Sequence, residues 1–229
     1  MEDATVADLP AEVVALLPDA LCFEMAETFC HRVYYPRFVA IETPDDDEFD
    51  FPGLSEPIMY LFGEDQGIMD LGIAISREGY PVFVSYDDDE DGRRVLLHAE
   101  SLEEYIAACA FDRRVLGAPV VVLGQAPKLT DDLLGHLVST LTRGPHTMAW
   151  PTETQYRFSG DGVQLLLWDW DEGQCDWHIS GPDLDTVSRF VRSLHDAPID
   201  YFYCHDMADE DLRAILRAGG EGSGQPSTV

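Results

Sequence analysis

The sequence has very little positive charge. Lys128 is its only lysine, and 14 Lys and Arg residues stand against 44 Asp and Glu residues, which gives a formal net charge of −30 at pH 7. A chain this negative repels phosphate backbones and anionic lipids, so direct binding to nucleic acid or to a membrane is disfavoured. The same charge would attract a basic protein and speed the encounter with it. The alternative is that the acidity only maintains solubility.

Long apolar runs are also missing from the chain. No stretch approaches the ~18 uninterrupted apolar residues that a membrane-spanning helix requires. The acidic N-terminus lacks the basic and then apolar pattern of a secretory signal. Hydrophobic residues make up 45% of the chain, which is normal for a globular protein. We therefore expect a cytoplasmic protein with a substantial core.

The common catalytic motifs are absent as well. The sequence contains no G-x-S-x-G, no H-E-x-x-H and no G-x-x-x-x-G-K-[ST] pattern. Its seven histidines stand at no recognised catalytic spacing. We predict that the protein is not an enzyme, that it has no catalytic residues and that it uses no cofactor. A hydrolase or metal protein built from its Asp, His and Cys residues is the alternative.

Cysteine is scarce and poorly spaced for disulfides or zinc. The five cysteines form no C-x-x-C pair, and their number is odd. They are Cys22, Cys30, Cys109, Cys175 and Cys204. The pairs Cys30-His31, Cys175-x-x-His178 and Cys204-His205 could meet as a metal site. Because Cys is among the most buried residue types on packing grounds alone, we predict buried, reduced thiols and no metal.

What the chain does contain is a recurring order of elements. Hydrophobic periodicity, caps and turns predict helices over 10–17, 20–33, 101–111, 130–141, 183–194 and 209–217. They predict strands over 58–62, 71–75, 81–86, 93–98, 119–123, 147–150, 154–158, 163–168, 175–180 and 199–204. A shift of 82 residues superimposes much of the two halves without a gap, and it places the helix cap Ser101 on Asp183.

This recurrence predicts an α+β fold, in which two similar units of antiparallel β-meander plus helices pack as one compact body. The expected boundaries are 1–112 for an acidic N-terminal unit and 113–220 for a second unit, followed by a disordered tail at 221–229. Acid is concentrated in the first unit: residues 1–112 hold 27 acidic and five basic residues.

Two acidic runs stand out, at residues 45–50 and 87–91. We predict that they contact a basic partner, and the predicted partner-binding residues are Asp45, Asp46, Asp47, Glu48, Asp50, Tyr86, Asp87, Asp88, Asp89, Glu90 and Asp91. The second run also resembles the first half of a calcium loop. However, His98 occupies the twelfth position, where such a loop needs a glutamate, and Asp-Gly is itself a hairpin signal. We therefore expect a solvated hairpin tip.

A third pattern alternates aromatic and acidic residues over 168–172. Side chains alternate between the two faces of a strand, so Trp168 and Trp170 share one face and the acids share the other. We expect both tryptophans in the core. The alternative is an aromatic and acidic rim on a protein interface, where Trp is enriched.

Four stretches within residues 57–112 form a further pattern: a turn-rich meander at Tyr60–Gly63, a strand at Tyr80–Tyr86, an acidic hairpin at Asp87–Gly92 and a closing helix that begins within Ala99–Ile106. In these stretches the chain resembles the SUKH superfamily, whose members include bacterial immunity proteins that neutralise toxins. The resemblance implies a non-enzymatic protein binder. It leads us to expect an inhibitor of a basic nuclease or deaminase toxin. An acidic mimic of nucleic acid that blocks a DNA-handling enzyme is the alternative.

Overall fold

A computed structural model describes residues 9–20, 31–33, 41–45, 49–64, 69–88, 92–170, 173–194 and 199–204. It confirms the α+β class with antiparallel sheets. The chain divides into two compact units, which are described separately below. Unit 1 comprises residues 1–113 and 145–154, and unit 2 comprises residues 114–144 and 155–229. Among the described residues, no helix is long and apolar enough to span a bilayer.

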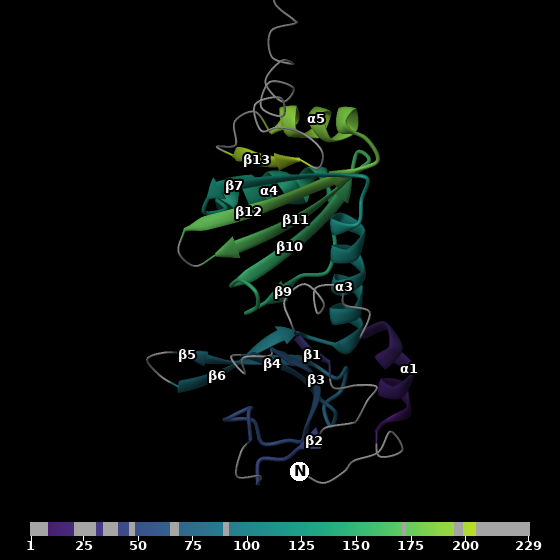
Figure 1. The fold of residues 1–229 in the computed structure, drawn as a ribbon, viewed down its shortest axis with the longest axis vertical. Coiled ribbons are helices and arrows are strands. Elements are labelled where there is room, and N and C mark those ends of the chain that lie inside the picture. The colour runs from purple at the N-terminus through teal and green to yellow at the C-terminus, as the bar shows by residue number, and fades with distance from the viewer. Residues whose placement is uncertain are drawn as a thin grey trace, which may run out of the picture. The chain divides into compact units, whose positions relative to one another are not determined.

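Unit 1 contains a six-stranded antiparallel sheet in the order β1-β3-β4-β5-β6, with β2 paired to β3 (Figure 1). Its strands are β1 (His31–Val33), β2 (Ile41–Glu42), β3 (Ile58–Glu64), β4 (Met69–Ala74), β5 (Val82–Asp88) and β6 (Gly92–Ala99). Helix α1 (Ala11–Ala20) precedes the sheet. Helix α3 (Leu102–Leu116) follows it and passes the unit boundary at Arg113. The short strand β9 (Thr147–Met148) contacts β6.

The sheet of unit 1 is buried on both faces. One face, which we call the helix face, packs Leu71, Ile73 and Val84 against residues of α1 and α3. The other face, which we call the loop face, packs Phe83 against Phe51 from the loop that precedes β3. A strand with two buried faces loses the simple alternation of apolar and polar residues, and all six residues of β4 are buried.

Unit 2 contains a second antiparallel sheet, in the order β13-β7-β12-β11-β10-β8. Its strands are β7 (Val120–Pro127), β8 (Thr142–Arg143), β10 (Thr154–Gly160), β11 (Val163–Trp170), β12 (Gln174–Gly181) and β13 (Asp200–Cys204). Helices α4 (Asp131–Thr140) and α5 (Leu184–Ser193) cover one face (Figure 1). Their core partners on the sheet include Leu165, Leu167 and Trp177. Thr130 caps α4 and Asp183 caps α5, as their positions before apolar helical repeats predict.

The 82-residue shift holds for the pairing of strands as well as for their order. In the β5–β6 hairpin, Val84 pairs with Leu96 and Tyr86 with Arg94. In the β11–β12 hairpin, the residues 82 positions further along pair in the same way, Leu166 with His178 and Trp168 with Asp176. Helix α3 likewise begins at Leu102 and helix α5 at Leu184. The predicted recurrence of elements is therefore confirmed for the part of the chain that the structure describes.

The helices after these two hairpins nevertheless pack on opposite faces. Helix α3 packs on the face of Val84, whereas α5 packs against Leu165 and Leu167, on the face opposite to Leu166. The β5–β6 pairing shifts register between Val82 and Phe83, and the β11–β12 pairing does not. Because a one-residue slip moves side chains to the other face, the extra residue in β6 accounts for the reversal.

One predicted helix is partly wrong. Residues 31–33, expected within a helix over 20–33, form strand β1, which pairs with β3 through His31 and Glu64. Pairing along an available sheet edge overrides helix propensity in so short a segment. The helix expected over 10–17 also ends later than predicted, since α1 continues to Ala20. The helix expected over 209–217 and the tail at 221–229 lie outside the described residues.

Candidate functional site

One described residue from each acidic run, Asp50 and Asp87, lies on the loop face of unit 1. Asp50 lies in the loop before β3, and Asp87 lies near the end of β5. Both are linked to Arg93 of β6: the Asp50 carboxylate accepts a hydrogen bond from Arg93 Nη1 at 2.5 Å, and Asp87 is the strand partner of Arg93. Side chains of directly paired residues project to the same face of a sheet. The loop and the hairpin therefore meet at one arginine.

Arg93 also contacts two residues of the neighbouring strands. Its Nη2 donates to Asp70 Oδ2 on β4, and its Nε donates to Ser85 Oγ on β5 at 2.9 Å. Ser85 Oγ in turn donates to the backbone carbonyl of Asp50. The guanidinium thus makes three directed contacts, which its planar fork of donors allows.

A tyrosine extends this network toward β2. Tyr60 Oη donates to Glu42 Oε2 at 2.6 Å and lies 3.0 Å from Asp50 Oδ2. The Asp50 backbone N–H also donates to Glu42 Oε2 at 3.3 Å. We call Glu42, Asp50, Tyr60, Asp70, Ser85 and Arg93 the Arg93 cluster. It ties residues from five strands, β2 to β6, to the loop that holds Asp50.

Acidic groups outnumber basic groups within the cluster. The carboxylates of Asp50 and Asp70 bind one guanidinium, and the third carboxylate, that of Glu42, binds Tyr60. Glu42 and Asp70 are only 8% and 6% exposed. Burial raises the pKa of Asp70 to about 6; Arg93 opposes this shift, and the charges of Asp50 and Glu42 add to it. Burial, followed by its hydrogen bond to Glu42, raises the pKa of Tyr60, so this phenol stays neutral. The cluster is therefore a negatively charged structural centre.

The remaining predicted partner-binding residues have different positions. Asp45 and Asp87 are exposed, whereas Asp50 is half-buried and held by Arg93 and Tyr60. Tyr86 is half-buried against the core on the helix face, opposite Asp87. Asp88 is paired with Gly92. The residues Asp46, Asp47, Glu48, Asp89, Glu90 and Asp91 lie outside the described part of the chain.

The expected hairpin at the second acidic run is confirmed by its flanking strands. Asp88 of β5 pairs with Gly92 of β6, and Gly92 has a φ of 79°, the left-handed conformation that glycine adopts readily. His98, at the twelfth position of the calcium-like pattern, is buried, and its Nδ1 lies 2.7 Å from the Met148 carbonyl oxygen. Cys109, Cys175 and Cys204 are buried thiols outside any disulfide, as expected for packed thiols. Cys22 and Cys30 lie outside the described residues.

The expectation that Trp168 and Trp170 lie in the core is wrong. Both are half-buried, and they project from β11 on the face of the sheet away from α4 and α5. The core side of this strand is instead occupied by Leu165 and Leu167, because the alternation of side chains allows only one of the two sets to face the helices. The carboxylate of Asp169, on the helix-covered face, accepts from Leu129 N at 3.4 Å.

Polar residues of the neighbouring strands surround these tryptophans. Trp170 Nε1 donates to Asp176 Oδ2 at 2.7 Å, and the rings of Trp168 and His178 lie 4.7 Å apart between centroids. Burial lowers the pKa of His178, so its ring is neutral at pH 7. We call Trp168, Trp170, Gln174, Asp176 and His178, together with Gln125 of β7, the tryptophan patch.

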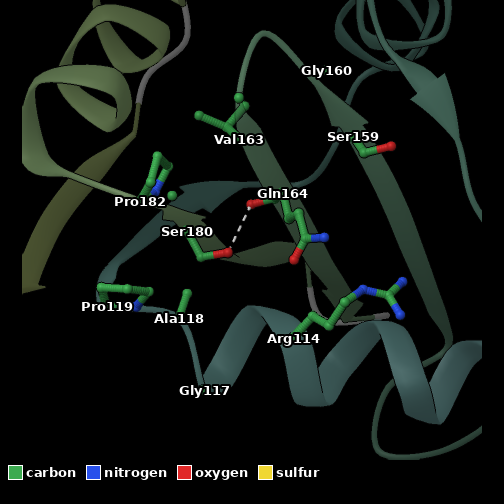
Figure 2. Close-up of a pocket in the computed structure, with 12 residues that line it drawn as sticks. Arg114, Gly117, Ala118, Pro119, Ser159, Gly160, Val163, Gln164, Ser180 and Pro182 are labelled. Atoms are coloured by element: carbon green, nitrogen blue, oxygen red, sulfur yellow. Dashed lines mark hydrogen bonds between the residues drawn. The ribbon is translucent and has the colours of Figure 1, made fainter.

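Unit 2 also contains a pocket of about 680 Å³ between the end of α3 and one end of the sheet (Figure 2). Arg114 is the one charged residue among the described residues that line it, and its polar neighbours are Ser159, Gln164 and Ser180. Ser180 Oγ donates to the Gln164 carbonyl oxygen at 3.5 Å (Figure 2). This lining offers hydrogen-bonding groups but no pairing of a nucleophile with a general base.

Sequence reasoning missed Glu42, Asp70 and Arg93 as members of a site. A usable signal was present at two of them. Asp70 interrupts an apolar strand between Met69 and Leu71, and Arg93 is one of only five bases among residues 1–112. A charged residue in a buried strand needs a partner, so these two residues could have been paired.

Comparisons of the chain with protein-family models, with curated proteins and with solved structures found no match.

Proposed function

We propose that this protein is a non-enzymatic, immunity-type inhibitor that binds a basic protein toxin, a nuclease or deaminase, through the acidic surface of unit 1. The contact surface is formed by the 45–50 loop and the 87–91 hairpin. The resemblance of residues 57–112 to SUKH immunity proteins supports a binding role. The net charge of −30 supports a basic partner.

One observation supports this proposal more than any other: Arg93, the strand partner of Asp87, binds Asp50, so one residue from each acidic segment lies on the same face of one sheet. The loop is fixed through Asp50, and Ser85, two residues before Asp87, donates to the Asp50 carbonyl. A surface that is held in place before binding loses less conformational entropy when the partner arrives. Two acidic runs that each bring a residue to the same face, Asp50 and Asp87, favour a compact protein contact. A nucleic-acid mimic would instead spread its charge along an extended face.

The proposal is tested by affinity capture followed by an inhibition assay. The wild-type chain is used to capture its partner from a native lysate, and the partner's toxic activity is then titrated with the inhibitor. We expect a basic protein whose activity is abolished at stoichiometric inhibitor. An acidic partner, or a basic partner that retains full activity in the complex, would contradict the proposal.

A matched pair of variants separates the local surface from the overall charge. The hairpin variant carries Asp87→Asn, Asp88→Asn, Asp89→Asn and Asp91→Asn. The control variant carries Glu100→Gln, Glu153→Gln, Asp161→Asn and Asp185→Asn, which are exposed positions scattered over both units. Both variants lose four negative charges, so we expect inhibition to weaken in the hairpin variant and to persist in the control.

A further inference from the structure

The tryptophan patch of unit 2 is held together by hydrogen bonds that converge on the carboxylate of Asp176. Asp176 accepts three hydrogen bonds from neutral donors: Trp170 Nε1 at 2.7 Å, Gln174 Nε2 at 2.9 Å and Gln125 Nε2 at 3.1 Å. These donors come from β11, β12 and β7, three adjacent strands of the sheet. The carboxylate and the indole of Trp170 are therefore held in fixed positions before any ligand binds.

The strand register places the members of the patch on one face. Trp168 pairs with Asp176, and Asp176 pairs with Gln125 on the other side. Trp170 pairs with Gln174 at the end of the hairpin. Two aromatic rings thus lie beside one carboxylate, on the face that α4 and α5 leave uncovered.

The charge of this carboxylate is not balanced locally. Asp176 forms no ion pair among the described residues, and its three hydrogen-bond donors are all neutral. His178 is neutral at pH 7 because burial lowers its pKa. The nearby Lys128 acts electrostatically on Asp169, whose contact with Leu129 lies on the helix-covered face. The patch therefore combines aromatic surface with one carboxylate that has no ion-pair partner in the described part of the chain.

We propose that the tryptophan patch is a second contact surface for the basic partner and binds an arginine side chain. A guanidinium is planar, stacks on aromatic rings and is attracted both by the π face and by a carboxylate. Lysine fits this patch less well, because its ammonium is more strongly hydrated and cannot stack. Tryptophan and arginine are also the residues that contribute most often to the binding energy of protein interfaces. This inference rests on the proposed function for the identity of the partner, but its chemistry can be tested alone.

The test is an NMR titration of the indole N–H signals of the full-length protein. The chain has four tryptophans, and single Trp→Phe variants assign their signals. The probe is a blocked peptide of alternating glycine and arginine. The control peptide has citrulline in place of arginine, which keeps the planar side chain but removes its charge.

We expect the arginine peptide to shift the Trp168 and Trp170 signals saturably. Trp177 is fully buried in the core on the other face, and its signal should not move. The affinity should fall with added salt, and Asp176→Asn should weaken it at least threefold. Equal binding of the citrulline peptide would show a neutral aromatic patch and overturn the inference, as would equal shifts at Trp177.

The hairpin variant keeps this test separate from the proposed function. Its four substitutions lie in unit 1, so peptide binding at the patch should persist when they are made. A patch that binds no arginine peptide would overturn the inference, while capture and inhibition of a basic toxin would still support the proposed function. The opposite result, a patch that binds arginine in a protein that inhibits no toxin, would refute the proposed function alone.

Discussion

Arg93 of β6 binds the carboxylate of Asp50 at 2.5 Å, and this contact joins the two acidic segments of unit 1. The same guanidinium contacts Asp70, so one base pairs directly with two carboxylates, and the nearby Glu42 adds a third negative charge to the cluster. Removing it would leave these negative charges close together and partly buried.

Replacing Arg93 should destabilise the protein considerably. Arg93→Met keeps most of the aliphatic stem but leaves Asp50 and Asp70 without a counter-charge, and we expect a loss of ~3 kcal/mol in the free energy of unfolding at pH 7. This value is at the low end for buried pairs because the Asp50 side chain is 36% exposed. Urea denaturation measures the change.

The neighbouring Arg94 provides the control for this prediction. It is exposed, and Arg94→Met should lower the free energy of unfolding by less than ~1 kcal/mol. Equal losses in the two variants would contradict the role given to Arg93.

The stability of the protein should depend on the protonation of Asp70. Its pKa is about 6 in the folded state against an ordinary value of 3.8, so the folded chain binds this proton more tightly than the unfolded chain does. The contribution of Asp70 to the free energy of unfolding is therefore fully present below pH 3.8 and is lost as the pH rises to about 6. Asp70→Asn removes this titration. We expect the difference in unfolding free energy between wild type and Asp70→Asn to change over this pH range and to be constant above it. If the unfolding free energies of the two proteins instead change in parallel with pH, the raised pKa of Asp70 is refuted.

Gly72 should tolerate no larger side chain. A Cβ at this position of β4 would collide with Ile58 Cγ2 and would lie 2.8 Å from Phe51 Cζ, on the loop face. Overpacking of this kind costs ~1–3 kcal/mol, so Gly72→Ala should lower the melting temperature. Gly135 in α4 offers the matched control, because nothing lies within 4 Å of a Cβ there. Gly135→Ala should stabilise the helix by ~0.5–1 kcal/mol. An unchanged melting temperature for Gly72→Ala would contradict this prediction, because it would show that the loop around Phe51 moves aside without a loss of stability.

Much of the fold could be predicted because it depends on local patterns. Caps, turns and the 82-residue shift gave the order of elements, and the shift even matches the strand pairing of the two hairpins. The face on which each following helix packs could not be predicted. It depends on one extra residue near His98 in the β5–β6 pairing, and a bulge of that kind has no distinctive sequence signature.

The candidate site was less predictable for a related reason. The acidic runs are visible in the sequence, but the bonds of Asp50 to Arg93 and Tyr60 join residues 43 and 10 positions away. The sequence does not distinguish one acidic residue of a run from another. In the folded chain, however, Asp50 is half-buried within the Arg93 cluster, whereas Asp87 is exposed. The two tryptophans were misplaced because alternation shows which residues share a face but not which face is covered.

The central claim is that the acidic hairpin of unit 1 directs the encounter with a basic partner. The most direct test is the association rate of the captured partner, measured by stopped flow over a series of salt concentrations, for wild type, the hairpin variant and the control variant. Screening is strong beyond ~8 Å at physiological salt, so charges near the contact dominate the salt dependence. We expect the hairpin variant to associate about tenfold more slowly at low salt, with a flatter salt dependence, and the control to stay close to wild type. Identical rates and salt slopes for the two variants would contradict the claim and would leave the charge as a means of solubility.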